Sequence, residues 1–263
     1  MSTNDKYEFS RVKSPWKRAR KRFTMDIRYR ISCRPALWPL MIPYAWARSR
    51  RKGNREGAFA EEAFPSADFP LVVDGYPGSA NSAATKAMRN YLPEGTHFGN
   101  HYHSPAETLR GLDLGVPVLL TIRHPERAVV SFLRRWDFVT LPSAIRYYIW
   151  FYEAMLPKIE QMVVSDFSYT INHIDGIAEQ LKDRFGVPLE RRAEAPEGGK
   201  PPPPKVGSGQ KMRSKDELTA MFYRSIPPEE IARAESIYER LLNHPGTLKD
   251  EDQLESRRKS ATL

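Results

Sequence analysis

Residues 116–131 read VPVLLTIRHPERAVVS, an apolar run that becomes polar at Thr121 and continues to Arg123 and, eight residues later, Ser131. A short, continuous run of Val and Leu is typical of a strand buried on both faces. An arginine that leaves such a strand, with a serine at a helix start beyond it, is suited to bind a phosphate group. This stretch therefore predicts a buried strand, a helix over 128–135 and an anion site where they meet.

A second strand-to-helix turn lies upstream. Residues 69–76 read FPLVVDGY, a further buried strand, and run into PGSANSAATK at 77–86. Small residues at such a turn let backbone N–H groups surround an anion, and the helix N-terminus adds partial positive charge. The turn lacks the Gly-Lys-Ser/Thr of a nucleotide-hydrolase P-loop, so a kinase is a weaker interpretation.

These two stretches, in this order, resemble the cofactor-binding segments of sulfotransferases that use PAPS (3′-phosphoadenosine 5′-phosphosulfate). In that family, an Arg-x-Pro after a strand and a Ser at this distance bind the 3′-phosphate, and a Pro-Lys-Ser-Gly-Thr-Thr-like loop binds the 5′-phosphosulfate. The resemblance implies that Arg123 and Ser131 contact the 3′-phosphate. It implies that the phosphosulfate loop consists of Pro77, Gly78, Ser79, Ala80, Asn81 and Ser82.

The loop departs from the family pattern at two positions. Gly78 stands where most members have Lys or Arg, and Ala80 replaces a Gly. The missing cation bears on catalysis, because it would offset charge that develops on the bridging oxygen of the leaving group. Lys86 lies about one helical turn beyond Ser82, too far to replace it. We expect Ser79 to act with the loop N–H groups on the transferring group.

A histidine segment lies between the two turns. Residues 101–105, HYHSP, resemble the family's Lys-Thr-His-x-Pro, which implies that His103 is the general base and that His101 takes the place of the Lys. A neutral imidazole can accept the proton of an acceptor hydroxyl near pH 7. Four of the chain's 6 histidines lie between His97 and His124, so a metal site is an alternative. We expect none, because carboxylate and Cys partners are missing nearby. A structural role for His103 also stays open.

The composition of the 263 residues, 40% hydrophobic and 28% charged, indicates one substantial globular core. Cys33 is the single cysteine, so no internal disulfide can form, and no Asn-x-Ser/Thr acceptor is present. No apolar signal region and no membrane-spanning run are found. These features predict a cytoplasmic protein, with peripheral attachment to the cytoplasmic membrane face as a further expectation.

The net charge of +9 belongs to the N-terminal part of the chain. Residues 11–55 contain 15 Lys/Arg and one acid, Asp26, whereas the rest is mildly acidic. Within this arm, residues 36–47 are apolar or aromatic, including Trp38, Tyr44 and Trp46, and are interrupted by prolines. Aromatic residues flanked by Arg are typical of a segment at an anionic membrane surface. The alternatives are an arm that packs on the globular body and, least expected, one that binds nucleic acid.

The second half of the chain predicts further helices and strands. Residues 143–155 are rich in aromatics and predict a core helix, with an acceptor pocket as the alternative. Residues 161–167 predict a buried strand, and 171–185 an amphipathic helix. The Pro/Gly-rich residues 196–209 predict a loop. The resemblance places Lys205 and Lys211 near a loop that closes over the 3′-phosphate, although a plain linker fits as well.

The alternation of strands and helices predicts an α/β fold with a central parallel sheet. The family resemblance implies that this is a three-layer α/β/α fold of the P-loop nucleotide-hydrolase-like sulfotransferase type. We expect a basic arm (1–55), a sulfotransferase-like domain (56–245) and a charged tail (246–263). The implied reaction transfers a sulfuryl group from PAPS to a hydroxyl or amine of a carbohydrate, lipid or small metabolite, and releases adenosine 3′,5′-bisphosphate (PAP). The alternatives are an inactive protein that binds PAP or a partner, and a membrane-surface scaffold that acts through the arm.

Overall fold

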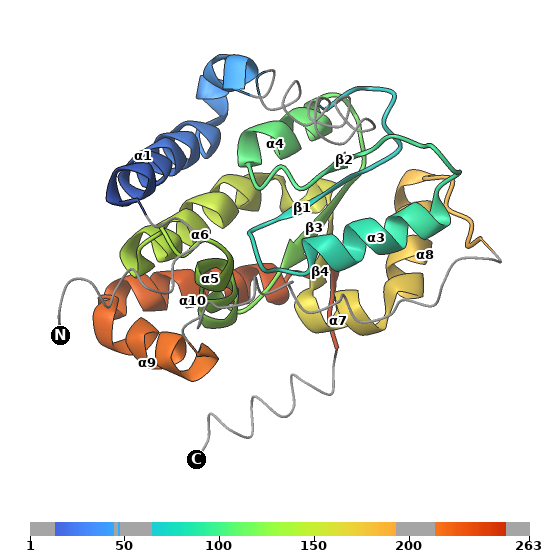
Figure 1. Cartoon of the computed structure of the whole chain (residues 1–263). Helices are drawn as coiled ribbons and strands as arrows, with labels where there is room; N and C mark the ends of the chain where they lie inside the picture. Colours follow the sequence, from blue (N-terminus) through green and yellow to red (C-terminus); the bar gives the residue numbers. More distant parts are fainter. Residues whose placement is uncertain (1–13, 45–46, 48–64, 193–213, 251–263) are drawn as a thin grey trace.

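The computed structural model describes residues 14–44, 47, 65–192 and 214–250 (Figure 1). Its centre is a sheet whose five described strands are all parallel and lie in the order β2-β1-β3-β4-β5. The strands are β1 (Val72–Gly75), β2 (Gly99–Asn100), β3 (Val118–Ile122), β4 (Val163–Asp166) and β5 (Thr247–Leu248). The predicted α/β class with a parallel sheet is therefore confirmed.

The helices alternate with the strands along most of the chain. They are α1 (Pro15–Ser32), α3 (Asn81–Tyr91), α4 (Pro105–Asp113), α5 (Pro125–Arg135), α6 (Leu141–Met155), α7 (Phe167–Asn172), α8 (Ile174–Phe185), α9 (Lys215–Ser225) and α10 (Pro228–Leu242), with short 3-10 turns η1 (Pro35–Leu37) and η3 (Leu156–Gln161). The helices predicted over 128–135 and 143–155 and the strand predicted over 161–167 are confirmed as α5, α6 and β4.

Side chains of each strand alternate between two apolar layers, as the pleat requires. Leu71 and Val73 pack with the residues of α3 and α8, whereas Val72, between them, packs with those of α4, α5 and α6. Helices thus cover both faces of the sheet (Figure 1), an arrangement compatible with a three-layer α/β/α fold.

Two predicted boundaries differ from the structure. The single helix expected over 171–185 is wrong, because His173 leaves the helical region (φ −130°, ψ 49°) and separates α7 from α8. Asp166 starts α7 directly after β4 by accepting a hydrogen bond from the Ser168 N–H (3.2 Å). In the segment interpreted as a tail, β5 pairs with β4 and completes the sheet.

The described part of the arm packs on the globular body. Helix α1 begins at Ser14, whose side chain accepts from the Lys17 N–H, and at Pro15. Its inner face stacks Tyr29 on Tyr147 of α6, with ring centroids 4.2 Å apart. Helix α1 of the arm therefore packs on the body, whereas in the apolar stretch after it Met41 is buried and Leu40 and Ile42 are exposed. The Pro/Gly-rich loop predicted at 196–209 lies outside the described residues, as do Lys205 and Lys211.

A candidate anion site at the carboxyl edge of the sheet

The loop between β1 and α3 folds around two left-handed residues. Gly78 has φ +93° and Ala80 has φ +77°, and α3 begins directly afterwards. The backbone N–H groups of Gly78, Ala80, Asn81 and Ser82 form no hydrogen bond with any residue in the described part of the chain. Consecutive N–H groups left open by such a turn at a helix N-terminus form an anion-binding concavity.

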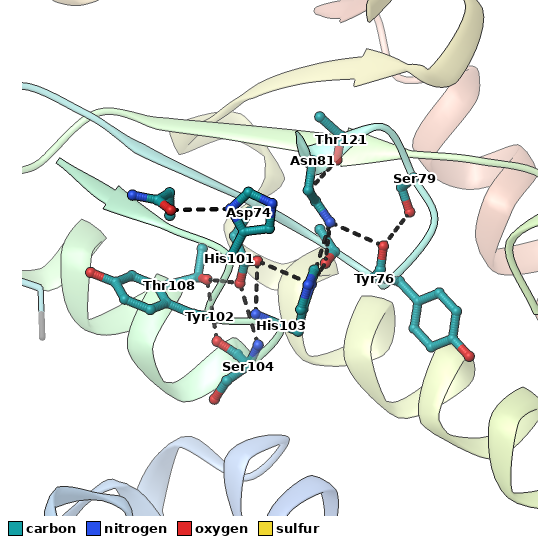
Figure 2. Close-up of polar contacts among 12 residues, drawn as sticks. Asp74, Tyr76, Ser79, Asn81, His101, Tyr102, His103, Ser104, Thr108 and Thr121 are labelled. Carbon is teal, nitrogen blue, oxygen red and sulfur yellow. Dashed lines mark hydrogen bonds and ion pairs between the residues drawn. The ribbon is translucent and has the colours of Figure 1, made fainter. Parts of the chain in front are cut away.

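Asn81 braces this loop rather than facing a ligand with its side chain. Its Nδ2 donates to the carbonyls of Gly75 (2.9 Å) and Tyr76 (3.2 Å), as Figure 2 shows. Its Oδ1 accepts from Thr121 Oγ1 at 2.6 Å. The loop is thereby tied to the neighbouring strand β3. The contact is close, because a Cβ at Gly75 would lie 2.4 Å from the Thr121 carbonyl oxygen, so only glycine fits there.

The two loop serines point in opposite directions. Ser79 is fully buried, and its hydroxyl donates to the Tyr76 carbonyl (2.7 Å) and lies 3.0 Å from Tyr152 Oη of α6. Ser82 is exposed at the start of α3, with its Oγ 3.1 Å from His101 Nε2. Pro77 is buried. The structure thus places the hydroxyl of Ser79, predicted to be catalytic, in the core, and that of Ser82 at the surface of the loop.

His101 is oriented by a short chain of hydrogen bonds. Asn100 Nδ2 donates to the Phe98 carbonyl (2.9 Å), which directs Asn100 Oδ1 toward His101 Nδ1 at 3.0 Å. An amide oxygen only accepts, so Nδ1 carries the proton, and Nε2 accepts from the Ser82 hydroxyl. The ring of His101 is thereby held beside the first turn of α3.

His103 lies against the end of β1 (Figure 2). Its Nδ1 is 2.9 Å from the Gly75 carbonyl oxygen, which can only accept, so Nδ1 donates and Nε2 is the nitrogen that can take a proton. Its backbone N–H donates to Asp74 Oδ1 at 2.8 Å. His101 (φ +54°) and His103 (φ +48°) are both left-handed, a conformation in which histidine is more frequent than most residues.

Asp74 anchors the histidine segment from inside the sheet. The carboxylate is fully buried, and Oδ2 accepts from Thr108 Oγ1 (2.8 Å) and the Ser104 N–H (3.3 Å). Burial raises the pKa of Asp74 to about 6, against the lowering effect of hydrogen bonds from the His103 N–H and Thr108. Asp74 Oδ1 lies 3.7 Å from His103 Nδ1, so this carboxylate also faces the imidazole.

Helix α1 reaches the same segment. Arg28 Nη2 donates to the Tyr102 carbonyl and lies 3.3 Å from the His103 carbonyl oxygen. Sequence reasoning did not identify Arg28, because no local pattern indicates a contact between residues more than seventy positions apart. The arm therefore supports the loop that carries the candidate base.

Arg123 and Ser131 converge on Gly78 from the neighbouring strand-to-helix turn. Arg123 Nη1 donates to the Gly78 carbonyl at 2.9 Å, and its guanidinium lies 3.7 Å from the centre of the Phe167 ring. A Cβ at Gly78 would lie 2.9 Å from Ser131 Cβ. The two segments predicted to bind phosphate are thus brought together by the pairing of β1 with β3. The same contact explains why Gly78 carries no lysine, since any side chain there meets Ser131 and strains a left-handed residue.

The guanidinium of Arg123 is largely withdrawn from water. Burial, and then the nearby charge of Arg127, lower the pKa of Arg123 to about 10. Its Nε is buried and has no hydrogen-bond partner among the described residues. Arg123 is half-buried, and a partly desolvated guanidinium beside the loop N–H groups is suited to an anionic ligand.

The aromatic helix α6 packs in the core, as predicted. Tyr147, Tyr148, Phe151 and Tyr152 are buried. Two of these residues also support the site: Tyr148 Oη donates to the Arg123 carbonyl (2.8 Å), and Tyr152 Oη donates to the Thr121 carbonyl (2.9 Å). These supporting roles have no signature in the sequence beyond the aromatic spacing.

The histidines do not gather into a metal site. The rings of His101 and His103 have centroids 5.7 Å apart, whereas His124 contacts Tyr238 on another helix. Within residues 14–44, 47, 65–192 and 214–250, no group of three or more His, Cys, Asp or Glu side chains is arranged to hold a metal ion.

The left-handed Ala80 gives a stability test of this loop. Ala80→Gly should raise the free energy of unfolding by about 0.5–1 kcal/mol, because this conformation costs a non-glycine residue about 1–2 kcal/mol and the more flexible unfolded chain removes part of that gain. Urea denaturation measures the difference. Gly115→Ala is the matched control, since Gly115 has φ +77° with nothing within 4 Å of its added Cβ and should show the opposite sign. A destabilised Ala80→Gly protein would contradict the left-handed turn.

Comparison of the chain with protein-family models, with curated proteins and with solved structures finds no match to any of them.

Proposed function

We propose that this protein is a PAPS-dependent sulfotransferase built on a P-loop-like sulfotransferase fold. The observation that supports this most is the shared anion site: the open N–H groups of the Gly78–Ser82 turn and the half-buried guanidinium of Arg123 meet at Gly78. Two phosphate-binding elements on adjacent parallel strands suit a ligand with a phosphate at each of two positions, such as a nucleoside 3′,5′-bisphosphate.

In this proposal, PAPS supplies the sulfuryl group, and the chain orients it and removes a proton. The N–H groups at the start of α3 bind the phosphosulfate end, and Arg123 with Ser131 binds the 3′-phosphate. His103 Nε2 takes the proton from the acceptor hydroxyl or amine as its oxygen or nitrogen bonds to sulfur and the bond from sulfur to the bridging oxygen breaks. The Gly75 carbonyl and Asp74 hold the ring in the required tautomer.

The positive charge missing at Gly78 has a candidate replacement in His101. Its Nε2 lies 3.1 Å from Ser82 Oγ, beside the open N–H groups. When protonated, this ring places a cation at the start of α3, where charge on a leaving group would develop.

A catalytically inactive protein that binds PAP is the second candidate. It is favoured by two features of the loop: Gly78 has no cationic side chain, and the Ser79 hydroxyl is buried against Tyr152. Such a protein would bind PAP and PAPS with similar affinity and transfer no sulfuryl group to any acceptor.

Calorimetric titration with PAP, PAPS, AMP and ATP tests the binding site. We expect PAP and PAPS to bind at least tenfold more tightly than AMP, because charge-assisted bonds to the 3′-phosphate contribute about 1.5–3 kcal/mol each. ATP with Mg²⁺ serves as the control for a kinase-type site. Tighter binding of ATP than of PAP, or equal binding of PAP and AMP, would contradict the proposal.

A further inference from the structure

The outer face of α1 carries an apolar stripe that no other described residue covers. Trp16, Phe23 and Ile27 are 75%, 65% and 39% exposed. Their spacing of seven and four residues places them within about 40° of one another around the helix. The opposite side of α1, which includes Arg18, Tyr29 and Ser32, is buried against the body. The helix therefore presents apolar side chains on two faces, of which the protein covers one.

The charges on this outer face are all positive. Lys17 and Arg20 are exposed beside the apolar side chains. Asp26, the only acidic residue of α1, is directed to the body, where it accepts a hydrogen bond from Tyr147 Oη. The surface is thus complementary to a partner that is anionic and also accommodates large apolar side chains.

Two further large apolar side chains are exposed beyond the end of α1. Leu40 and Ile42, in the helical residues 38–44, are 58% and 44% exposed. Figure 1 shows α1 at the periphery of the molecule, on the outside of α6. The aromatic residues that the sequence favoured for this contact are placed otherwise: Trp38 is half-buried, and Tyr44 stacks beneath Arg28 at 5.5 Å. Trp46 lies outside the described residues.

We propose that the outer face of α1 docks parallel to an anionic lipid bilayer. Trp16, Phe23 and Ile27 would enter the headgroup region, and Lys17 and Arg20 would contact lipid phosphates. Peripheral contact is the relevant mode, because no helix in the described part of the chain is long and apolar enough to cross a membrane. A nucleic acid would satisfy the cations but would leave Phe23 and Ile27 uncovered. The proposal does not depend on sulfuryl transfer.

Sedimentation with lipid vesicles tests the apolar contribution. At low salt, the full chain should bind to vesicles that contain phosphatidylcholine and phosphatidylglycerol. It should bind much more weakly to vesicles of phosphatidylcholine alone. Combining Trp16→Ala, Phe23→Ala and Ile27→Ala should weaken the binding about tenfold or more, because the buried apolar area is lost. The matched control combines Ile171→Ala and Tyr223→Ala, which are 41% and 54% exposed on other helices, and should leave binding unchanged.

A charge series separates lipid from other anionic partners. Lys17→Gln with Arg20→Gln should reduce binding to the anionic vesicles, as should added salt, whereas Lys182→Gln with Arg224→Gln should not. Unchanged thermal melting and PAP affinity would show that the α1 variants are folded. Failure of the full chain to sediment with anionic vesicles at low salt would overturn the proposal. An equal loss of vesicle binding in the control variants would also overturn it. The same holds if the chain binds duplex DNA through Lys17 and Arg20 but binds no vesicles.

Discussion

Replacing His103 by asparagine should lower the rate of sulfuryl transfer by about 10²–10⁴ and change the affinity for PAP by no more than a few-fold. Asparagine tolerates the left-handed backbone at this position and can still donate to the Gly75 carbonyl, so the loop should keep its shape. What the variant loses is the nitrogen that accepts a proton in the proposed reaction. Single-turnover rates and calorimetric PAP affinities measured on the same preparation separate these two effects.

The other histidines are the controls for this prediction. His97→Gln should have little effect on turnover, since His97 precedes β2, whereas His101 and His103 follow the carboxyl end of that strand. His101→Gln should lower turnover without removing the base, if His101 supplies positive charge to the departing PAP. If His103→Asn retains full activity while His97→Gln or His101→Gln abolishes it, the choice of base is wrong.

Arg123→Ala should weaken PAP binding about tenfold or more and reduce the preference for PAP over AMP to a similar extent, because a charge-assisted bond to the 3′-phosphate is lost. A smaller loss for AMP is also expected, since Arg123 holds the Gly78 carbonyl of the loop that both ligands would use. The informative quantity is therefore the ratio of the two dissociation constants, obtained by calorimetry.

Two variants control for charge and shape at this position. Arg127→Ala removes a neighbouring cation that contributes to the lowered pKa of Arg123, and should leave the preference for PAP nearly unchanged. Arg123→Lys keeps the positive charge but loses the planar guanidinium. Its preference for PAP over AMP should lie between those of the wild type and Arg123→Ala. If Arg123→Ala weakens the binding of PAP and of AMP by the same factor, Arg123 only supports the loop.

The sequence was sufficient to locate the strand-to-helix turns of the site. The apolar runs before Gly75 and Arg123 are short and continuous, and such runs are characteristic of strands covered on both faces. Their order predicted that Gly78 and Arg123 lie at the same edge of a parallel sheet, and the pairing of β1 with β3 confirms this proximity. The aromatic spacing of 143–155 likewise predicted a core helix, because its apolar side chains recur on nearly every side.

The orientation of individual polar side chains was not predictable in the same way. Ser79 and Ser82 are close in sequence and chemically identical, yet one hydroxyl is buried against Tyr152 and the other faces His101. The difference arises from the left-handed turn at Ala80 and from the packing of α6 beneath the loop. Neither feature is encoded within the loop itself.

The N-terminal arm shows what its composition determines and what depends on the tertiary structure. Its composition alone determined that residues 11–55 are strongly basic and interspersed with aromatic and apolar side chains. Only the tertiary structure decided that Tyr29 and Arg28 turn inward, to Tyr147 and to the histidine segment, while Trp16 and Phe23 remain outside. Local periodicity shows which residues share a face of a helix. Because α1 has apolar side chains on two faces, periodicity alone does not determine which face packs on the body. That depends on contacts with residues more than seventy positions away.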